Sequence, residues 1–332
     1  MRQGWLHNVA ALLVVPVLLA TTASLVVARP PVRFDLEKMC AEADAILLGE
    51  VLHVAESGLE TLRYPDPDHE VAWKRFTATV QVARSLKGGY AEGATVNVAY
   101  WWPTASSVLF AFDVLSPDEK AMIFAKRGAG TSPELELINP FAAKLPVSLS
   151  PCPAAAGADL AVVDAVLKEL GCSLCGSDRK TVLAAMDAVS RCYPLPAALV
   201  PELRAIPIVY GRDVSTEALT LRLRMGDSSA IAPAIDLLAR HGERATTAPA
   251  VEVPGRPKSK GNFRFTLLAD SLWHVRSDVS DPQLLTLENH PDATFQRIGS
   301  RLRRARDLAI ERRQKLVSPR DSGTEFRLPS VR

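Results

Sequence analysis

Five cysteines carry most of the reactive chemistry in this sequence, and Cys172 and Cys175 form a Cys-x-x-Cys pair. Such a pair can close a local disulfide, act as a thiol–disulfide redox centre, or supply two of the four ligands of a zinc site. A redox centre of the thioredoxin kind follows a strand, whereas a helical pattern precedes this pair. A zinc site would have to recruit Cys192 and a distant histidine. We therefore favour a structural disulfide between Cys172 and Cys175.

The other two cysteines of this region, Cys152 and Cys192, are expected to bond to each other. A helix over residues 178–191 would be about 20 Å long, at about 1.5 Å per residue, which separates Cys175 from Cys192. A disulfide needs Cα atoms within about 7 Å of each other. In an antiparallel helical hairpin the start of the first helix meets the end of the second. We therefore predict a Cys152–Cys192 bond, with Cys40 left free or paired within the N-terminal half.

Histidines and short motifs give no sign of catalysis. The six histidines have no paired metal-ligand spacing. The sequence also lacks a nucleophile elbow, a phosphate-binding loop and a dinucleotide fingerprint. We predict that the chain is not an enzyme and that it binds no metal and no cofactor.

Two further groups of residues indicate binding surfaces. Trp101 and Trp102 are adjacent on a predicted strand, so one should enter the core and the other should be exposed, as in carbohydrate- or peptide-binding barrels. Arg301 and Arg304 belong to an arginine-rich segment, 297–315, which could engage anionic lipid, cell-wall polymer or nucleic acid. A solvated helix with cations near its C-terminal end is the simpler explanation.

The elements that would position these residues divide into two halves. A short helix is expected at 34–44 and a polar loop at 56–70. Alternating or continuous apolar residues predict strands over 45–54, 76–82, 95–100, 108–110, 121–125 and 135–138. Three- and four-residue apolar spacing then predicts helices over 159–170, 178–191, 196–206, 215–225, 229–241, 263–276 and 292–315. Gly171 is expected to end the first of these helices.

The N-terminal residues predict the cellular compartment of the protein. Arg2 precedes an uncharged run, 9–28, that ends just before Arg29, which is typical of an export signal. The run is also long enough to span a bilayer, so an uncleaved anchor is the alternative. We predict a secreted, periplasmic or cell-envelope protein that meets a membrane only through residues 1–28, if they stay uncleaved.

The remaining chain divides into a small β-barrel at 33–151 and an α-helical bundle or short repeat domain at 152–315. Within the helical domain, residues 245–262 read as a flexible loop, and residues 316–332 read as a disordered tail. The predicted fold class is therefore α+β, with more than one domain.

Residues 40–51 (Cys-Ala-Glu-Ala-Asp-Ala-Ile-Leu-Leu-Gly-Glu-Val), the strand at 80–82, the turn at 86–88 and the strand at 95–98 resemble the netrin-like module shared with tissue inhibitors of metalloproteinases. The resemblance covers roughly residues 40–151 and implies an OB-fold barrel. Inhibitors of that family chelate zinc through an N-terminal Cys-x-Cys, which is absent near Arg29, so that route is not implied here. Further along the chain, residues 218–238 are similar to one HEAT-like helical repeat.

Composition fits an ordinary globular protein. The 332 residues include 39 Lys and Arg against 37 Asp and Glu, and 48% are hydrophobic. These values exclude wholesale disorder, a polytopic membrane protein and a chain built mainly to coat nucleic acid. We expect an exported, non-catalytic interaction or scaffold protein whose partner is a protein or a cell-envelope component and not a nucleic acid. The alternatives are a metalloproteinase-inhibitor-like regulator and a thiol–disulfide oxidoreductase that uses Cys172 and Cys175.

Overall fold

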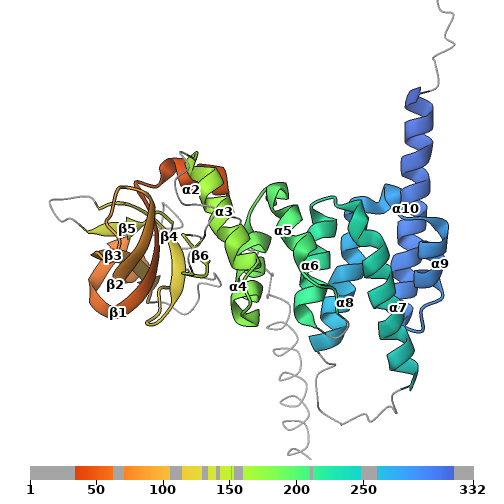
Figure 1. The fold of residues 1–332 in the computed structure, drawn as a ribbon, viewed down its shortest axis with the longest axis horizontal. Coiled ribbons are helices and arrows are strands. Elements are labelled where there is room, and N and C mark those ends of the chain that lie inside the picture. The colour runs from red at the N-terminus through yellow and green to blue at the C-terminus, as the bar shows by residue number, and fades with distance from the viewer. Residues whose placement is uncertain are drawn as a thin grey trace, which may run out of the picture.

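The structure is a computed structural model, and it describes residues 34–62, 71–104, 114–128, 134–139, 143–150, 152, 160–209, 212–247 and 260–317. A β-sheet occupies one end of the longest axis, and helices follow one another along the rest of it (Figure 1). The fold class is α+β, as the sequence predicted. The expected export segment, the strand at 108–110 and the tail after 317 lie outside the described residues. The same holds for residues 248–259 of the expected flexible loop.

The sheet is mixed and closes partly into a ring. Its strands are β1 (Ala45–Leu62), β2 (Val71–Lys87), β3 (Thr95–Pro103), β4 (Lys120–Arg127), β5 (Leu135–Leu137) and β6 (Lys144–Pro146). They are ordered β1-β2-β3-β5-β4-β6, and β1 also pairs with β4, which closes the first five strands of this order into the ring. The β3–β5 pair is parallel and the other pairs are antiparallel.

Buried and exposed residues alternate along the strands, which places apolar side chains inside the ring. Ala78, Val80 and Val82 of β2 are buried, whereas Gln81 between them is exposed. Gly49 of β1 lies so close to β2 that a Cβ atom there would be 2.6 Å from the carbonyl oxygen of Gln81. A register shift in the pairing of β1 with β2 lies at the same point. Glycine is therefore required where the two strands approach most closely.

The prediction of a loop over 56–70 is wrong at its start and right at its end, and the strands predicted on either side of it, 45–54 and 76–82, are too short. Strand β1 continues to Leu62 and β2 starts at Val71, so the two strands extend well beyond the predicted ends. Polar cross-strand pairs accompany this extension, such as Lys74 Nζ at 2.9 Å from Glu56 Oε2. The region lacks a clean apolar alternation, which is why its sequence indicated a loop.

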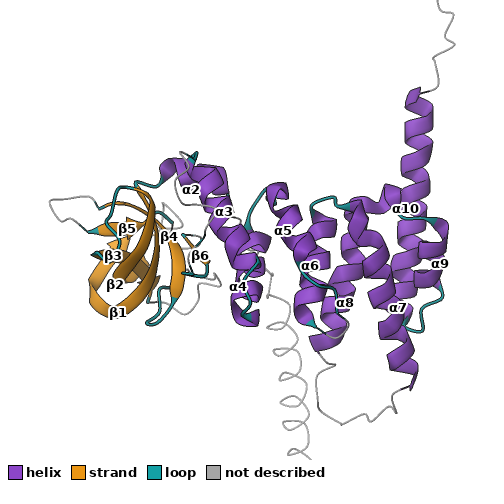
Figure 2. Cartoon of the chain, in the orientation of Figure 1, coloured by secondary structure: helices purple, strands orange, loops and turns teal. Residues whose placement is uncertain are grey.

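One helix, α2 (Leu36–Glu42), precedes the sheet in the chain, and all the other described helices follow it (Figure 2). They are α3 (Val162–Leu174), α4 (Arg179–Arg191), α5 (Val200–Ala205), α6 (Asp213–Arg224), α7 (Ile231–Thr247), α8 (Lys260–Ser271), α9 (Asp281–Glu288) and α10 (Ala293–Val317). The described residues also form three 3-10 helices between them, η2 (Ala197–Leu199), η3 (Ser228–Ala230) and η4 (Leu272–Asp278). Helix α9 was not predicted from the sequence, and Gly171 lies inside α3 instead of ending it.

Two apolar cores hold these elements together. The first contains residues of the sheet, α2, α3, α4 and α5, so it includes residues on both sides of residue 151. The second extends from α6 to α10. Helix α6 belongs to both, because Ala218 and Leu221 pack into the first core and Leu219 and Leu223 into the second. An ion pair of 2.7 Å between Arg84 of β2 and buried Glu169 of α3 also joins the sheet to the helices.

Candidate functional site

The residues that the sequence singled out lie in three separate places. Trp101 and Trp102 are on β3, at the sheet end of the molecule, and Arg301 and Arg304 are on α10, at the helical end (Figure 1). The clustered cysteines lie between them, around the α3–α4 hairpin. No single site therefore combines the three groups.

The tryptophans on β3 differ from the expected arrangement of one core and one exposed ring. Trp102 is exposed, but Trp101 is only partly buried and donates its indole N–H to Glu60 at 2.9 Å. The guanidinium of Arg75 lies 5.9 Å from the centre of the Trp101 ring. The fully buried tryptophan of this sheet is Trp73 on β2. Trp101 is thus held by polar neighbours and does not fill the core.

Both predicted disulfides, Cys152–Cys192 and Cys172–Cys175, are wrong. Cys152 is bonded to Cys172, with their Cα atoms 5.8 Å apart, while Cys192 is free and buried and Cys175 is free and exposed. The prediction placed Cys152 at the start of the first helix, but α3 starts only at residue 162. The Sγ atom of Cys152 lies 3.8 Å from the carbonyl oxygen of Lys168, so Cys152 is beside the second half of α3, within reach of Cys172.

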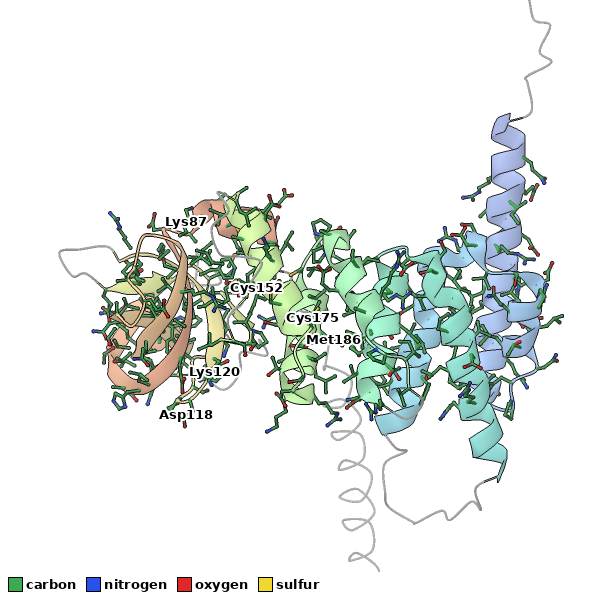
Figure 3. The ribbon with its side chains drawn as sticks, viewed as in Figure 1. Lys87, Asp118, Lys120, Cys152, Cys175 and Met186 are labelled. Atoms are coloured by element: carbon green, nitrogen blue, oxygen red, sulfur yellow. A yellow bond between two sulfur atoms is a disulfide. The ribbon has the colours of Figure 1, made fainter. Side chains whose placement is uncertain are left out.

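A hollow lies on the side of the hairpin that faces α5 and α6. Its volume is about 890 Å³, within the usual range of ligand pockets. Figure 3 marks Cys175, which lines it at the end of α3. Apolar side chains form much of the wall: Leu174, Val182, Ala205, Ile206, Pro207 and Val214. We call this hollow the hairpin pocket.

Glu202 of α5 is the polar group that distinguishes the hairpin pocket. Its Oε2 atom is buried and accepts no hydrogen bond from any described residue. Its side chain packs against Gly171, where an added Cβ atom would lie 3.3 Å from Glu202 Cγ. A buried carboxylate oxygen without a donor costs about 1–3 kcal/mol, and such atoms are rare in native proteins. Because Glu202 also lines the pocket, its carboxylate is the acceptor that the pocket offers to a ligand.

Asp213 fixes the rim of the pocket. Arg179 of α4 donates from Nε to Asp213 at 3.0 Å, and Arg264 of α8 lies 3.0 Å from the same carboxylate. The hydrogen bonds from Arg179 are the main reason that the pKa of Asp213 falls from its usual 3.8 to about 2. Asp213 thus ties three helices together as an anion. Arg212 beside it is exposed, lines the pocket and makes no ion pair with a described residue.

The surroundings of Cys175 make its thiol a weak nucleophile. Burial, followed by the negative charge of Glu202, raises the thiol pKa above its usual value. Cys175 also caps the C-terminal end of α3, where the helix dipole disfavours a thiolate. No histidine is among the described residues that line the pocket. Chemically, the pocket is suited to binding through Glu202 and its apolar wall.

This site was not predictable from the sequence, because Glu202, Asp213 and Arg264 lie far apart in the chain and match no motif. Packing of α3 to α6 and α8 brings them together. The described residues hold no group of three or more His, Cys, Asp and Glu side chains that could bind a metal ion. They also include no helix that is both long enough and apolar enough to cross a membrane. No protein-family model matches the chain, and no curated protein matches it.

Proposed function

We propose that this chain is an exported, non-catalytic interaction protein whose hairpin pocket takes up a basic side chain of a partner polypeptide. The observation that carries the proposal is the buried Oε2 atom of Glu202, which has no donor among the described residues. An ammonium or guanidinium group would supply that donor and a compensating charge. Hydrogen bonds of this charged kind are about twice as strong as neutral ones.

The pocket wall fits the rest of a Lys or Arg side chain. Such side chains bury their methylene stems against apolar surface while the charged head reaches a polar partner. Leu174, Val182 and Ile206 provide that apolar surface. Arg212 at the rim offers a second contact, to a carboxylate of the partner, which would fix the direction in which the partner segment lies.

Other features agree with a role in binding and export. A ring of five strands followed by packed helices is consistent with the netrin-like OB barrel and HEAT-like repeat to which the sequence is similar. Architectures of this kind mainly present surfaces to partners. The Cys152–Cys172 disulfide suits an oxidising compartment, which supports the proposed export.

The two alternative functions have less support. A thiol–disulfide oxidoreductase would need a reactive thiolate, whereas Cys172 is bonded to Cys152 and the pKa of Cys175 is raised. A metalloproteinase inhibitor would need zinc-binding groups, and the expected Cys-x-Cys is missing from the sequence after Arg29. Both alternatives therefore stay secondary proposals.

A peptide-display selection tests the proposal. The purified full chain is exposed to a library of random 12-residue peptides, and bound peptides are sequenced. We expect one class with an invariant Lys or Arg that binds the Glu202→Gln variant at least tenfold more weakly. Glu37→Gln, the same change on the exposed surface of α2, is the matched control and should bind as the wild type does. If every selected peptide binds Glu202→Gln and wild type equally, the proposal is wrong.

A further inference from the structure

The arginines of α10 fall into two groups with different surroundings. Arg303 donates to Glu288 at 2.8 Å and to Asp281 at 2.7 Å, and Arg306 donates to Asp281 at 2.8 Å. These ion pairs join α10 to α9. Arg301 and Arg304 are both exposed, and neither makes an ion pair with a described residue. The first group is therefore structural, and the second is available to a partner.

The unpaired group lies along one side of the helix. Arg297, Arg301, Arg304 and Leu308 are spaced by four, three and four residues, which places them on one face, and all four are exposed. Apart from a bond from Arg297 to the backbone of its own helix, this face makes no side-chain hydrogen bond within the described chain. Three cations and one leucine thus form a continuous strip.

A groove of about 410 Å³ borders this strip. Ile298, Arg301 and Leu302 of α10 form one side of it. Asp270 of α8 and Trp273 and His274 of η4 form the other side. The groove is therefore concave. Ile298 and Leu302 are buried and form its floor, Trp273 is its exposed apolar side chain, Asp270 lies on the α8 side, and Arg301 makes the α10 edge basic. We call it the α10 groove.

Exposed apolar side chains continue the groove along α8. Trp273 is 42% exposed, and Leu267 and Phe263, one turn apart on α8, are 40% and 67% exposed. The guanidinium of Arg276 lies 5.4 Å from the centre of the Trp273 ring, and Arg276 also donates to the Trp273 carbonyl oxygen at 2.9 Å. Trp273 is thus held in place at the surface. Exposed tryptophans beside arginines are the typical anchors of protein interfaces.

We infer that the α10 groove is a docking site for an acidic segment of a partner protein, with an apolar anchor packed against Trp273 and carboxylates paired with Arg301 and Arg304. Charge complementarity selects the acidic partner, because Arg301 and Arg304 make no ion pair with a described residue, and Asp270 across the groove interacts with Arg301 without forming one. The concave shape favours a polypeptide over a bilayer, which binds protruding apolar side chains on a flat face. Two copies of this chain would place like-charged strips against each other.

This site is independent of the hairpin pocket, because none of the side chains that line it lines the pocket. One experiment can therefore separate the two proposals. Random 16-residue peptides are displayed and selected against the purified full chain. Bound clones are then tested on the Arg301→Gln/Arg304→Gln double variant and on Glu202→Gln. Clones that depend on the arginines report on the α10 groove, and clones that depend on Glu202 report on the pocket.

We expect an arginine-dependent class rich in Asp and Glu with at least one aromatic or large aliphatic residue. Its members should bind the double variant about tenfold more weakly than the wild type, and Trp273→Ala should weaken their binding by a similar factor. Circular dichroism and thermal unfolding verify that Trp273→Ala is folded. Arg312→Gln, an exposed arginine farther along α10, is the matched control and should change binding less than twofold.

Three results would each overturn the inference. The first is a selection that yields no acidic class. The second is an acidic class that binds the double variant as tightly as it binds the wild type. The third is binding of the full chain to vesicles containing 30% phosphatidylserine, lost in the double variant, when no peptide depends on the arginines. That third result would assign the strip to a membrane surface.

Discussion

Two carboxylates in the same part of the helical region have opposite surroundings. Asp227 accepts hydrogen bonds from Arg204 of α5 at 2.8 Å, from buried Arg222 of α6 at 2.8 Å and from Ser229 at 2.6 Å. Glu202, two residues before Arg204 on α5, has a buried oxygen that accepts none from a described residue. Side chains of the protein itself donate to Asp227, whereas no described residue donates to Oε2 of Glu202. Saturated bonding indicates a structural role for Asp227, and the open position indicates binding at Glu202.

Replacing Asp227 should have the largest effect on stability. Asp227→Ala would leave Arg222, whose side chain is 7% exposed, without its counter-charge. We expect the free energy of unfolding, measured with urea, to fall by about 3–5 kcal/mol. Asp236→Ala is the control, because it breaks an exposed ion pair with Arg240 and should cost less than about 0.5 kcal/mol. A loss below about 1 kcal/mol for Asp227→Ala would contradict the structural role of Asp227.

Acid should weaken the Asp213 junction at a defined pH. The pKa of Asp213 is about 2 in the folded chain, below its usual 3.8, so its stabilising effect is complete above about pH 4 and is lost as the pH falls toward 2. The shift corresponds to about 1–2 kcal/mol after a discount for the exposure of Arg179.

Urea unfolding between pH 4 and pH 2 provides the measurement. Asp213→Asn should be less stable than the wild type at pH 6 and nearly as stable at pH 2. The lowered pKa of Asp227 also contributes to the acid sensitivity of the wild type, and Asp213→Asn retains that part. A constant difference between Asp213→Asn and wild type over this range would contradict the assignment.

Replacing Glu202 should change stability little, in contrast to Asp227. Glu202→Met keeps the length of the side chain and removes the buried oxygen without a partner, so we expect the free energy of unfolding to rise by about 1 kcal/mol. The same variant should bind none of the selected basic peptides. If the variant loses more than about 1 kcal/mol, Glu202 has a structural role like that of Asp227.

The smallest effect is expected at Gly171, which lies inside α3 against Glu202. Gly171→Ala gains about 0.5–1 kcal/mol of helix propensity but pushes against Glu202 Cγ, so stability should change by less than about 0.5 kcal/mol. Displacement of Glu202 should weaken the binding of the basic peptides a few-fold, which titration calorimetry measures. Gly58→Ala on β1, where an added Cβ meets nothing within 4 Å, is the control. Unchanged binding by Gly171→Ala would show that the position of Glu202 is not critical.

Local patterns in the sequence predicted the α+β fold and most of the elements. Alternation identified the core of β2, and apolar spacing identified α3, α4 and α6 within a few residues. The same reasoning failed where tertiary packing decides. The ends of β1 and β2 are held by polar cross-strand pairs, and α9 is short, with Ser280 and Gln283 capping it.

The candidate site was less predictable than the fold. The Cys152–Cys172 bond depends on where Cys152 lies beside α3, and helix lengths alone gave a different partner. Glu202 carried no signal, because an ordinary surface glutamate has the same sequence context, and its missing hydrogen bond is visible only in three dimensions. Arg301 and Arg304 were found from charge alone, whereas Trp273, which borders the same groove as Arg301, was not.

A double-mutant cycle by titration calorimetry tests the central claim most directly. A selected basic peptide, and the same peptide with its invariant Lys or Arg replaced by norleucine, are each titrated into the wild type and into Glu202→Gln. We predict a coupling energy between Glu202 and the basic side chain of about 1.5–3 kcal/mol, roughly tenfold or more in affinity. A coupling energy near zero would show that Glu202 does not receive the basic group and would contradict the account.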